Sequence, residues 1–146
     1  MTARNGSADW RGDLKKGSGT VTVGNGVFQG AYTYGTRFGE DAGANPEQLI
    51  AAAQAACFTM ALAALLSSAG HAPQSLRTKA RVDMRNIAGA PTLARLDIDT
   101  EGYAPGVDEQ QFQRFAEEAK KNCPVARALA GIPEIALTAR LASAAA

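Results

Sequence analysis

The 146-residue chain contains two cysteines, and their surroundings differ. Cys57 lies in the middle of the nearly apolar run AAAQAACFTMALAALL, which has the composition of a core helix. Cys123 stands in KKNCPVARAL, where a helix is expected to begin shortly after two lysines. Two thiols in one chain allow redox chemistry in which a substrate oxidises one sulfur and the second sulfur closes a disulfide on it. The alternative is a pair of inert core cysteines, which the cysteine count alone favours because free cysteine is among the most buried residue types.

Other common catalytic groups are sparse. His71 is the single histidine, and we expect it at the surface just past a helix end. No Gly-x-Ser-x-Gly sequence occurs, so a serine hydrolase triad is not indicated. No Cys-x-x-Cys or His-x-x-x-His spacing occurs either, which argues against a zinc site. Thiol chemistry is therefore the best-supported option.

A reactive thiol at Cys57 requires a nearby cation, because the thiolate is the nucleophile and apolar surroundings disfavour it. No Lys or Arg lies between Asn45 and Gly70, so the cation must come from another segment. Arg37 is the best candidate by type, since a guanidinium stays charged when it is desolvated. A desolvated Arg needs an anionic partner, and Glu47 is the only acidic residue of the long helix. The simpler alternatives are a solvated loop charge for Arg37 and a first-turn carboxylate that interacts with the helix dipole for Glu47.

The spacing of Glu47 and Cys57 suggests a second chain. The helix between them spans about 15 Å, so the two side chains cannot share a site through direct contact within one helix. Two antiparallel copies of the helix, however, could place Glu47 of one chain near Cys57 of the other. A helix that is apolar on all sides also fits burial inside a homodimer. For Cys123, helix N-terminal amides would stabilise a thiolate, with an ordinary helix-entry residue as the alternative.

Composition limits the class of protein. The length suits one domain, residues 1–146, with one core. The net charge is +1 and no basic stripe with interleaved aromatic residues occurs, so nucleic acid is not an expected partner. The N-terminal segment lacks the apolar core of a secretory signal, and we expect a cytoplasmic protein. The apolar run from Leu49 to Leu66 is rich in alanine and has no aromatic belt, so we expect a buried central helix and no membrane partner.

The order of the expected elements indicates an α+β fold. Residues 8–38 are expected as strands and turns, with the last strand reaching Tyr34. A helix is predicted from Pro46 to about Ser68, because Asn45 is a strong N-cap and Gly70 a good terminator. Alternating apolar and charged residues predict three further strands with one wet face, and two helices precede the last of them. These strands cover residues 78–84, 92–101 and 135–141, and the helices cover residues 108–121 and 124–130.

Taken together, these residues resemble the OsmC/Ohr family of osmotically induced and organic-hydroperoxide-resistance peroxidases. The matching segments are Thr36-Arg37-Phe38, Asn45-Pro46-Glu47-Gln48-Leu49, Ala55-Ala56-Cys57-Phe58 and Asn122-Cys123-Pro124-Val125. Each segment is weak alone, but the combination and its spacing are specific, and the resemblance covers nearly the whole chain. The opening Trp10-Arg11-Gly12-Asp13 and the run Thr59-Met60-Ala61-Leu62 are more similar to the OsmC branch than to the Ohr branch.

The resemblance implies an OsmC-like fold, in which antiparallel sheets wrap around a long buried central helix, and an intertwined homodimer with active sites at the subunit interface. It implies a thiol-dependent peroxidase that reduces organic hydroperoxides, and hydrogen peroxide more weakly, in oxidative and osmotic stress defence. Cys57 would be the peroxidatic thiolate that becomes a sulfenic acid, and Cys123 the resolving thiol that condenses with it to an intramolecular disulfide. Arg37 and Glu47 would form, across the interface, the pair that activates Cys57. An external dithiol, of the lipoyl type in parts of the family, would reduce the enzyme, and no metal or organic cofactor is implied.

One departure from the family pattern is Gln54, since members often carry His three residues before the peroxidatic cysteine. The replacement removes a group that can change its charge near the site, which could alter the pH dependence. An apolar pocket lined by Phe38, Phe58 and Met60 is a hypothesis for a preference for organic hydroperoxides. Two alternatives stay open at this point. One is a non-catalytic redox sensor or small-molecule binding protein that uses the apolar dimer cleft, and the other is a structural stress protein with inert thiols.

Overall fold

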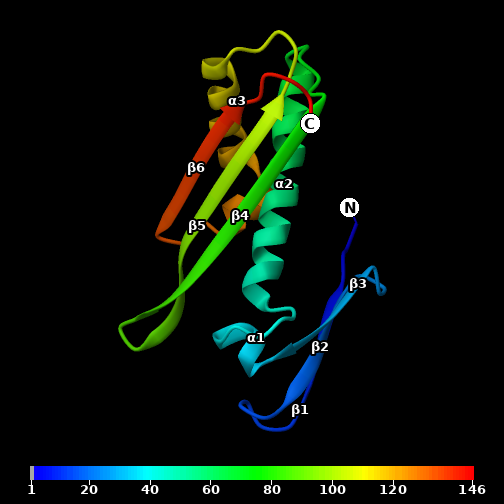
Figure 1. Cartoon of the computed structure of the whole chain (residues 1–146), viewed down its shortest axis with the longest axis vertical. Coiled ribbons are helices and arrows are strands. Elements are labelled where there is room, and N and C mark those ends of the chain that lie inside the picture. The colour runs from blue at the N-terminus through cyan, green and yellow to red at the C-terminus, as the bar shows by residue number, and fades with distance from the viewer. Residues whose placement is uncertain (1) are drawn as a thin grey trace. The chain divides into compact units, whose positions relative to one another are not determined.

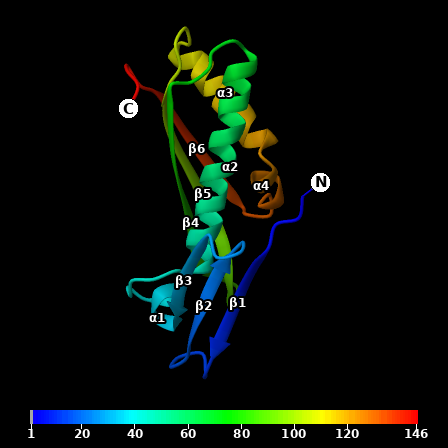
Figure 2. The same cartoon turned by 90° about the vertical axis from the view of Figure 1, so that its right-hand side faces the viewer.

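The computed structural model describes residues 2–146. The chain forms two compact units, one that ends at Leu49 and one over Ile50–Ala146. Figure 1 and Figure 2 show the elements of each unit from two directions. Their order along the chain is β1, β2, β3, α1, α2, β4, β5, α3, α4 and β6, which confirms the α+β class. A single domain over residues 1–146 stays a prediction.

The first unit contains a three-stranded antiparallel sheet of order β1-β2-β3. Its strands are β1 (Gly6–Arg11), β2 (Ser18–Val23) and β3 (Phe28–Thr33). Gly24 and Gly26 in the turn between β2 and β3 have φ angles of 59° and 92°, a region that side-chain-bearing residues rarely adopt. Val23 pairs with Phe28 across this turn, so β2 and β3 form a hairpin, in agreement with the strands and turns expected for this segment.

The segment after β3 differs from the prediction. Tyr34, expected at the end of a strand, instead begins the short helix α1 (Tyr34–Phe38). Thr33 caps this helix, because its hydroxyl accepts a hydrogen bond from the Thr36 backbone N–H at 3.2 Å, while the Thr36 hydroxyl accepts one from the Thr33 N–H at 2.9 Å. The usual sequence sign of such a reciprocal cap is a Glu or Gln at the third helical position. A threonine there gives no such sign, which is why the helix was not predicted.

The ends of the long helix α2 (Pro46–Ser68) agree with the prediction. The side chain of Asn45 caps the first turn by accepting a hydrogen bond from the Gln48 N–H at 2.8 Å. Gly70, just past the end, has a φ of 84°, which suits a glycine at this position.

A smaller part of the surface of α2 is buried than predicted. Its buried residues are Gln54, Phe58, Leu62 and Leu66, which recur every four positions and form one stripe. Met60, on another side, is 74% exposed. The expectation of a helix buried on all sides is therefore wrong for the single chain, because one sheet can cover only one side of a helix. The helix has the length and hydropathy to cross a membrane, but its stripe is part of the core of the second unit.

The second unit contains a three-stranded sheet of order β4-β5-β6. Strand β4 (Ser75–Ile87) pairs antiparallel with β5 (Ala90–Tyr103), whereas β6 (Glu134–Leu141) runs parallel to β5. The expectation of antiparallel sheets is thus wrong for this last pair. A parallel neighbour needs a long crossover, which α3 (Glu109–Asn122) and α4 (Pro124–Ala128) supply between β5 and β6.

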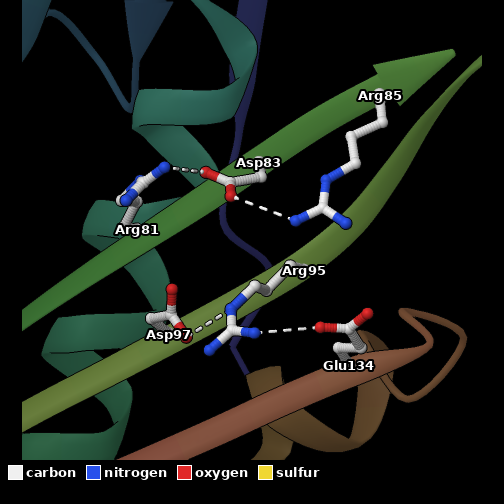
Figure 3. Close-up of polar contacts among 6 residues, drawn as sticks. All are labelled: Arg81, Asp83, Arg85, Arg95, Asp97 and Glu134. Atoms are coloured by element: carbon white, nitrogen blue, oxygen red, sulfur yellow. Dashed lines mark hydrogen bonds and ion pairs between the residues drawn. The ribbon is translucent and has the colours of Figure 1, made fainter.

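The two faces of this sheet have opposite character, as the alternation predicted. Figures 1 and 2 show α2 and α3 on one side of it, where Leu96 and Ile98 pack with Phe58 and Phe112 in the buried core. The other set of side chains forms a charged network over the strands (Figure 3). Its ion pairs include Arg81–Asp83 at 2.9 Å, Arg95–Asp97 at 2.8 Å and Arg95–Glu134 at 3.0 Å. This arrangement confirms the predicted wet face of the second sheet.

Candidate active site

The two cysteines lie side by side in the second unit. The Sγ atom of Cys123 is 2.7 Å from the Sγ atom of Cys57, although the residues are 66 positions apart in the sequence. Both thiols are free, and their separation exceeds the roughly 2.05 Å of a disulfide bond. A small shortening of this distance is enough to join the two sulfur atoms, so the arrangement suits reversible disulfide formation.

The position of Cys123 follows from the residue after it. A proline disfavours helical backbone at the preceding residue, and Cys123 accordingly has an extended conformation with φ −60° and ψ 120°. Its N–H donates to the Ala119 carbonyl at 2.9 Å and ends α3, while its carbonyl accepts from the Arg127 N–H at 3.0 Å and begins α4. Cys123 therefore stands at a fixed corner between two helices.

Exposure of the two thiols is the reverse of what their sequence surroundings suggest. Cys57, expected deep in a core helix, is only half-buried, whereas Cys123, expected at a helix start, is 0% exposed. The reason is that Cys57 lies off the buried stripe of α2, while the corner at Cys123 points its side chain into the core. A dissolved oxidant can thus reach Cys57 but not Cys123.

Burial raises the pKa of the Cys123 thiol, and its hydrogen bond with Cys57 raises this pKa further. The backbone amides of Ala126 and Val125, at the start of α4, act in the opposite direction and lower the pKa. The predicted influence of the helix N-terminus is present, but the loss of hydration outweighs it. Cys123 consequently favours its protonated form, and its ionisation requires a group that stabilises the thiolate.

A third side chain, Gln54, belongs to this cluster. It lies one helical turn before Cys57 on α2 and is 0% exposed. Its Nε2 atom donates a hydrogen bond to the Sγ atom of Cys123 at 3.9 Å. The sequence drew attention to Gln54 only as a departure from the family pattern. The three-residue spacing from Cys57, which places both on one side of the helix, was the signal for a place in the site.

Arg37 and Glu47 form an ion pair within the first unit. The Nε and Nη2 atoms of Arg37 both donate to the Oε1 atom of Glu47, at 3.2 and 2.9 Å. The guanidinium also lies 5.2 Å from the ring centroid of Phe38. The Nδ2 atom of Asn45 donates to the Thr36 carbonyl at 2.9 Å and so ties α1 to the start of α2. Arg37 is therefore not an isolated loop charge, and Glu47 does more than favour the helix dipole.

The structure thus groups the four predicted residues as two contacts, Cys57 with Cys123 and Arg37 with Glu47. Each contact is formed within its own unit. The activation of Cys57 by the ion pair stays a prediction.

Comparison with known sequences gives this arrangement a context. The sequence profile described as OsmC-like protein matches residues 39–138, which contain Glu47 and both cysteines. The chain belongs to the OsmC-like family. It is 40% identical over 127 residues to the protein named Peroxiredoxin OsmC of Escherichia coli (strain K12), an alignment that covers 86% of this chain and 89% of the relative. It is also 30% identical over 99 residues to the organic hydroperoxide resistance protein of Xanthomonas axonopodis pv. citri, over 66% of each chain.

Solved structures agree with this assignment. The organic hydroperoxide resistance protein from Elizabethkingia anophelis is 29% identical, with a TM-score of 0.74 over 97% of this chain and 99% of that one. An OsmC-like protein from Vibrio cholerae also has a TM-score of 0.74 at 14% identity, which shows a common fold. The OsmC-like fold, with two sheets and a long central helix, is confirmed.

Proposed function

We propose that this OsmC-like protein is a cysteine-based, thiol-dependent peroxidase that reduces organic hydroperoxides. The observation that carries the proposal is the 2.7 Å contact between the sulfur atoms of Cys57 and Cys123. The likeness to Peroxiredoxin OsmC supports the same activity.

Cys57 is the peroxidatic residue. Its thiolate attacks the distal oxygen of the hydroperoxide, the O–O bond breaks, and the alkoxide leaves and takes a proton to become an alcohol. The sulfur is oxidised to a sulfenic acid, and the peroxide is reduced. The half-buried position of Cys57 supports its role as the first thiol to react.

Cys123 is the resolving residue. Its thiolate attacks the sulfenic sulfur of Cys57, the S–O bond breaks, and hydroxide leaves to become water with the proton that Cys123 has lost. An external dithiol, of the lipoyl type in our proposal, then reduces the Cys57–Cys123 disulfide and is itself oxidised. The cycle uses only thiols and involves no cofactor.

The Arg37–Glu47 pair activates Cys57 in a homodimer. The dimer is supported by the apolar residues of α2 that this chain leaves uncovered, such as Met60 at 74% exposure. Two antiparallel copies of α2 would bury these residues and would bring Glu47 of one chain toward Cys57 of the other, since the two positions are about 15 Å apart along one helix. The guanidinium of Arg37, held by Glu47, then favours the Cys57 thiolate.

The substrate surface that we propose differs from the sequence hypothesis. Phe58 is 0% exposed and belongs to the core, so it cannot line an accessible pocket. Phe38, 44% exposed, remains as an apolar contact for an organic hydroperoxide, whereas Met60 belongs to the proposed dimer contact. We propose a preference for organic hydroperoxides over hydrogen peroxide, and action in the cytoplasm as a stress defence.

Mass spectrometry of the reduced protein after one equivalent of an organic hydroperoxide tests the proposal. We expect rapid loss of two hydrogens per chain, mapped to a Cys57–Cys123 link, and repeated turnover when a dithiol is in excess. Stoichiometric oxidation without turnover would indicate a redox sensor instead. Thiols that react only in denaturant would indicate a structural protein, and both results would contradict the peroxidase proposal.

A further inference from the structure

Gln54 occupies an unfavourable place for a polar side chain. It is fully buried on α2, in the stripe it shares with the apolar residues Phe58, Leu62 and Leu66. Its Oε1 atom has no hydrogen-bond partner among the residues that the structure describes. A buried amide with an unsatisfied oxygen destabilises a fold, and an apolar side chain of similar shape would avoid this cost. The interaction of the amide nitrogen, Nε2, must therefore explain why an amide occupies this position.

The amide nitrogen contacts a reacting atom. The Nε2 atom of Gln54 points to the Sγ atom of Cys123 at 3.9 Å, a long hydrogen bond even for sulfur. A thiol is a weak acceptor, and this distance suits a thiol. A charged acceptor shortens and strengthens hydrogen bonds, so the same N–H group interacts better with the Cys123 thiolate than with the thiol.

We propose that Gln54 is a positioning residue for the resolving step, whose side-chain amide orients Cys123 and stabilises its thiolate. The inference rests on the proposed function, in which Cys123 must lose its proton before it attacks the sulfenic sulfur of Cys57. The proton goes to the hydroxide that leaves Cys57, so that a thiol and a sulfenic acid become a disulfide and water.

The other groups around Cys123 leave a need for this donor. Cys57 on α2 is the titratable group that contacts it, and the amides of Val125 and Ala126 face it from α4. Burial still keeps the pKa of Cys123 above its ordinary value. Among residues 2–146, Gln54 is the one side chain outside the cysteine pair that donates a hydrogen bond to this sulfur.

Two substitutions separate donation from shape. Gln54→Met keeps the length and bulk of the side chain but removes the N–H group, whereas Gln54→His changes the shape and keeps a donor. After stoichiometric oxidation, we expect disulfide formation in Gln54→Met to slow about tenfold or more, since a hydrogen bond to a charged group contributes at least that factor. We expect Gln54→His to remain closer to the wild-type rate. Wild-type resolution in Gln54→Met, or equal slowing in both variants, would overturn the proposal.

A second measurement does not depend on peroxidase activity. In a Cys57→Ser background, the ultraviolet absorbance of the thiolate reports the ionisation of Cys123 as the pH is raised. We expect Gln54→Met to move this pKa further upward, and the control Leu62→Val, in the same stripe, to lower thermal stability without moving it. An unmoved pKa in Gln54→Met contradicts the role of Gln54. Gln54→Leu serves the same purpose if the methionine variant does not fold.

A failure of the proposed peroxidase function gives a different result from a failure of the proposal for Gln54. Formation of the Cys57 sulfenic acid is followed separately in Cys123→Ser, with Gln54 left in place. If Cys57 does not react with hydroperoxide there, the peroxidase proposal is wrong, while the titration of Cys123 still decides whether Gln54 stabilises its thiolate.

Discussion

The Oε1 atom of Glu47 accepts hydrogen bonds from both the Nε and the Nη2 atoms of Arg37, at 3.2 and 2.9 Å. The carboxylate side chain is 13% exposed and the guanidinium 39% exposed, so the pair is partly withdrawn from water. Such a pair fixes the direction of the guanidinium, which a flexible solvated arginine would not maintain. Glu47 is the one hydrogen-bond acceptor of this guanidinium among residues 2–146, so the remaining donors can bind a second anion.

The cation role of Arg37 predicts a change in thiol reactivity. Arg37→Ala should lower the thiolate fraction of Cys57, and alkylation of Cys57 at neutral pH should slow by about tenfold. Arg37→Lys is the matched control, because it keeps the charge and loses the forked geometry. Alkylation of Cys57 in this variant should be slower than in wild type and faster than in Arg37→Ala. Equal alkylation rates in wild type and Arg37→Ala would argue against activation by this pair.

Cys57→Ser should abolish peroxidase turnover, because a hydroxyl cannot replace the thiolate as the nucleophile. The assay is consumption of an organic hydroperoxide with a dithiol in excess. A Cys57→Ser protein with an undiminished rate would remove the basis of the assignment.

Cys123→Ser should stop the cycle one step later. Cys57 should still be oxidised once, and its sulfenic acid should persist long enough to be trapped by a dione reagent and identified by mass spectrometry. In the wild-type protein the same reagent should trap little, because the second sulfur lies 2.7 Å away. Equal trapping in both proteins would mean that Cys123 does not resolve the intermediate.

Stability should depend on pH through Cys123. Because its pKa is raised in the folded state, the folded protein holds this proton more tightly than the unfolded chain does. The contribution to the free energy of unfolding is thus complete below the ordinary thiol pKa, and it falls as the pH rises from there through the raised pKa. Urea unfolding of Cys57→Ser at several alkaline pH values should show this fall. The double variant Cys57→Ser/Cys123→Ser should show no such fall. An equal fall of the free energy of unfolding with pH in both variants would contradict the prediction.

The two sides of α2 should respond differently to substitution. Leu62→Ala should lower the free energy of unfolding by about 3 kcal/mol, because Leu62 is 0% exposed in the core. Met60→Asp should do little to a single chain but should weaken the proposed homodimer. Analytical ultracentrifugation would show a shift toward monomer, and an unchanged sedimentation coefficient would count against α2 as the dimer contact.

Local signals in the sequence were sufficient for most of the fold. The cap at Asn45 and the glycine at Gly70 bounded α2. Alternation over residues 92–101 indicated one buried face, which Ala94, Leu96 and Ile98 form in β5. Alternation fixes which face a residue occupies but not the direction of a strand, so the parallel pairing of β6 could not be read from it. The helix α1 was missed because its cap uses Thr33 and Thr36.

The candidate site was less predictable than the fold. Residue types suggested Glu47 as the partner of Arg37, and the resemblance to the family implied the contact of Cys57 with Cys123. The exposure of each thiol depends on tertiary packing, and sequence surroundings suggested the wrong order. The contact between Gln54 and Cys123 joins residues 69 positions apart, and no local pattern specifies it.

The burial of Cys123 affects how well the protein retains activity at high peroxide concentration. With its sulfur sealed from solvent, dissolved peroxide attacks a single sulfur per chain, and the second stays in its reduced form until it is used. Once Cys57 is a sulfenic acid, a neighbour held at fixed distance competes with a further peroxide molecule, which would carry the sulfur to an irreversible sulfinic acid. Disulfide formation with Cys123 has a constant rate, whereas the rate of oxidation to the sulfinic acid grows with peroxide concentration. Their ratio sets the concentration above which each cycle begins to inactivate the protein permanently.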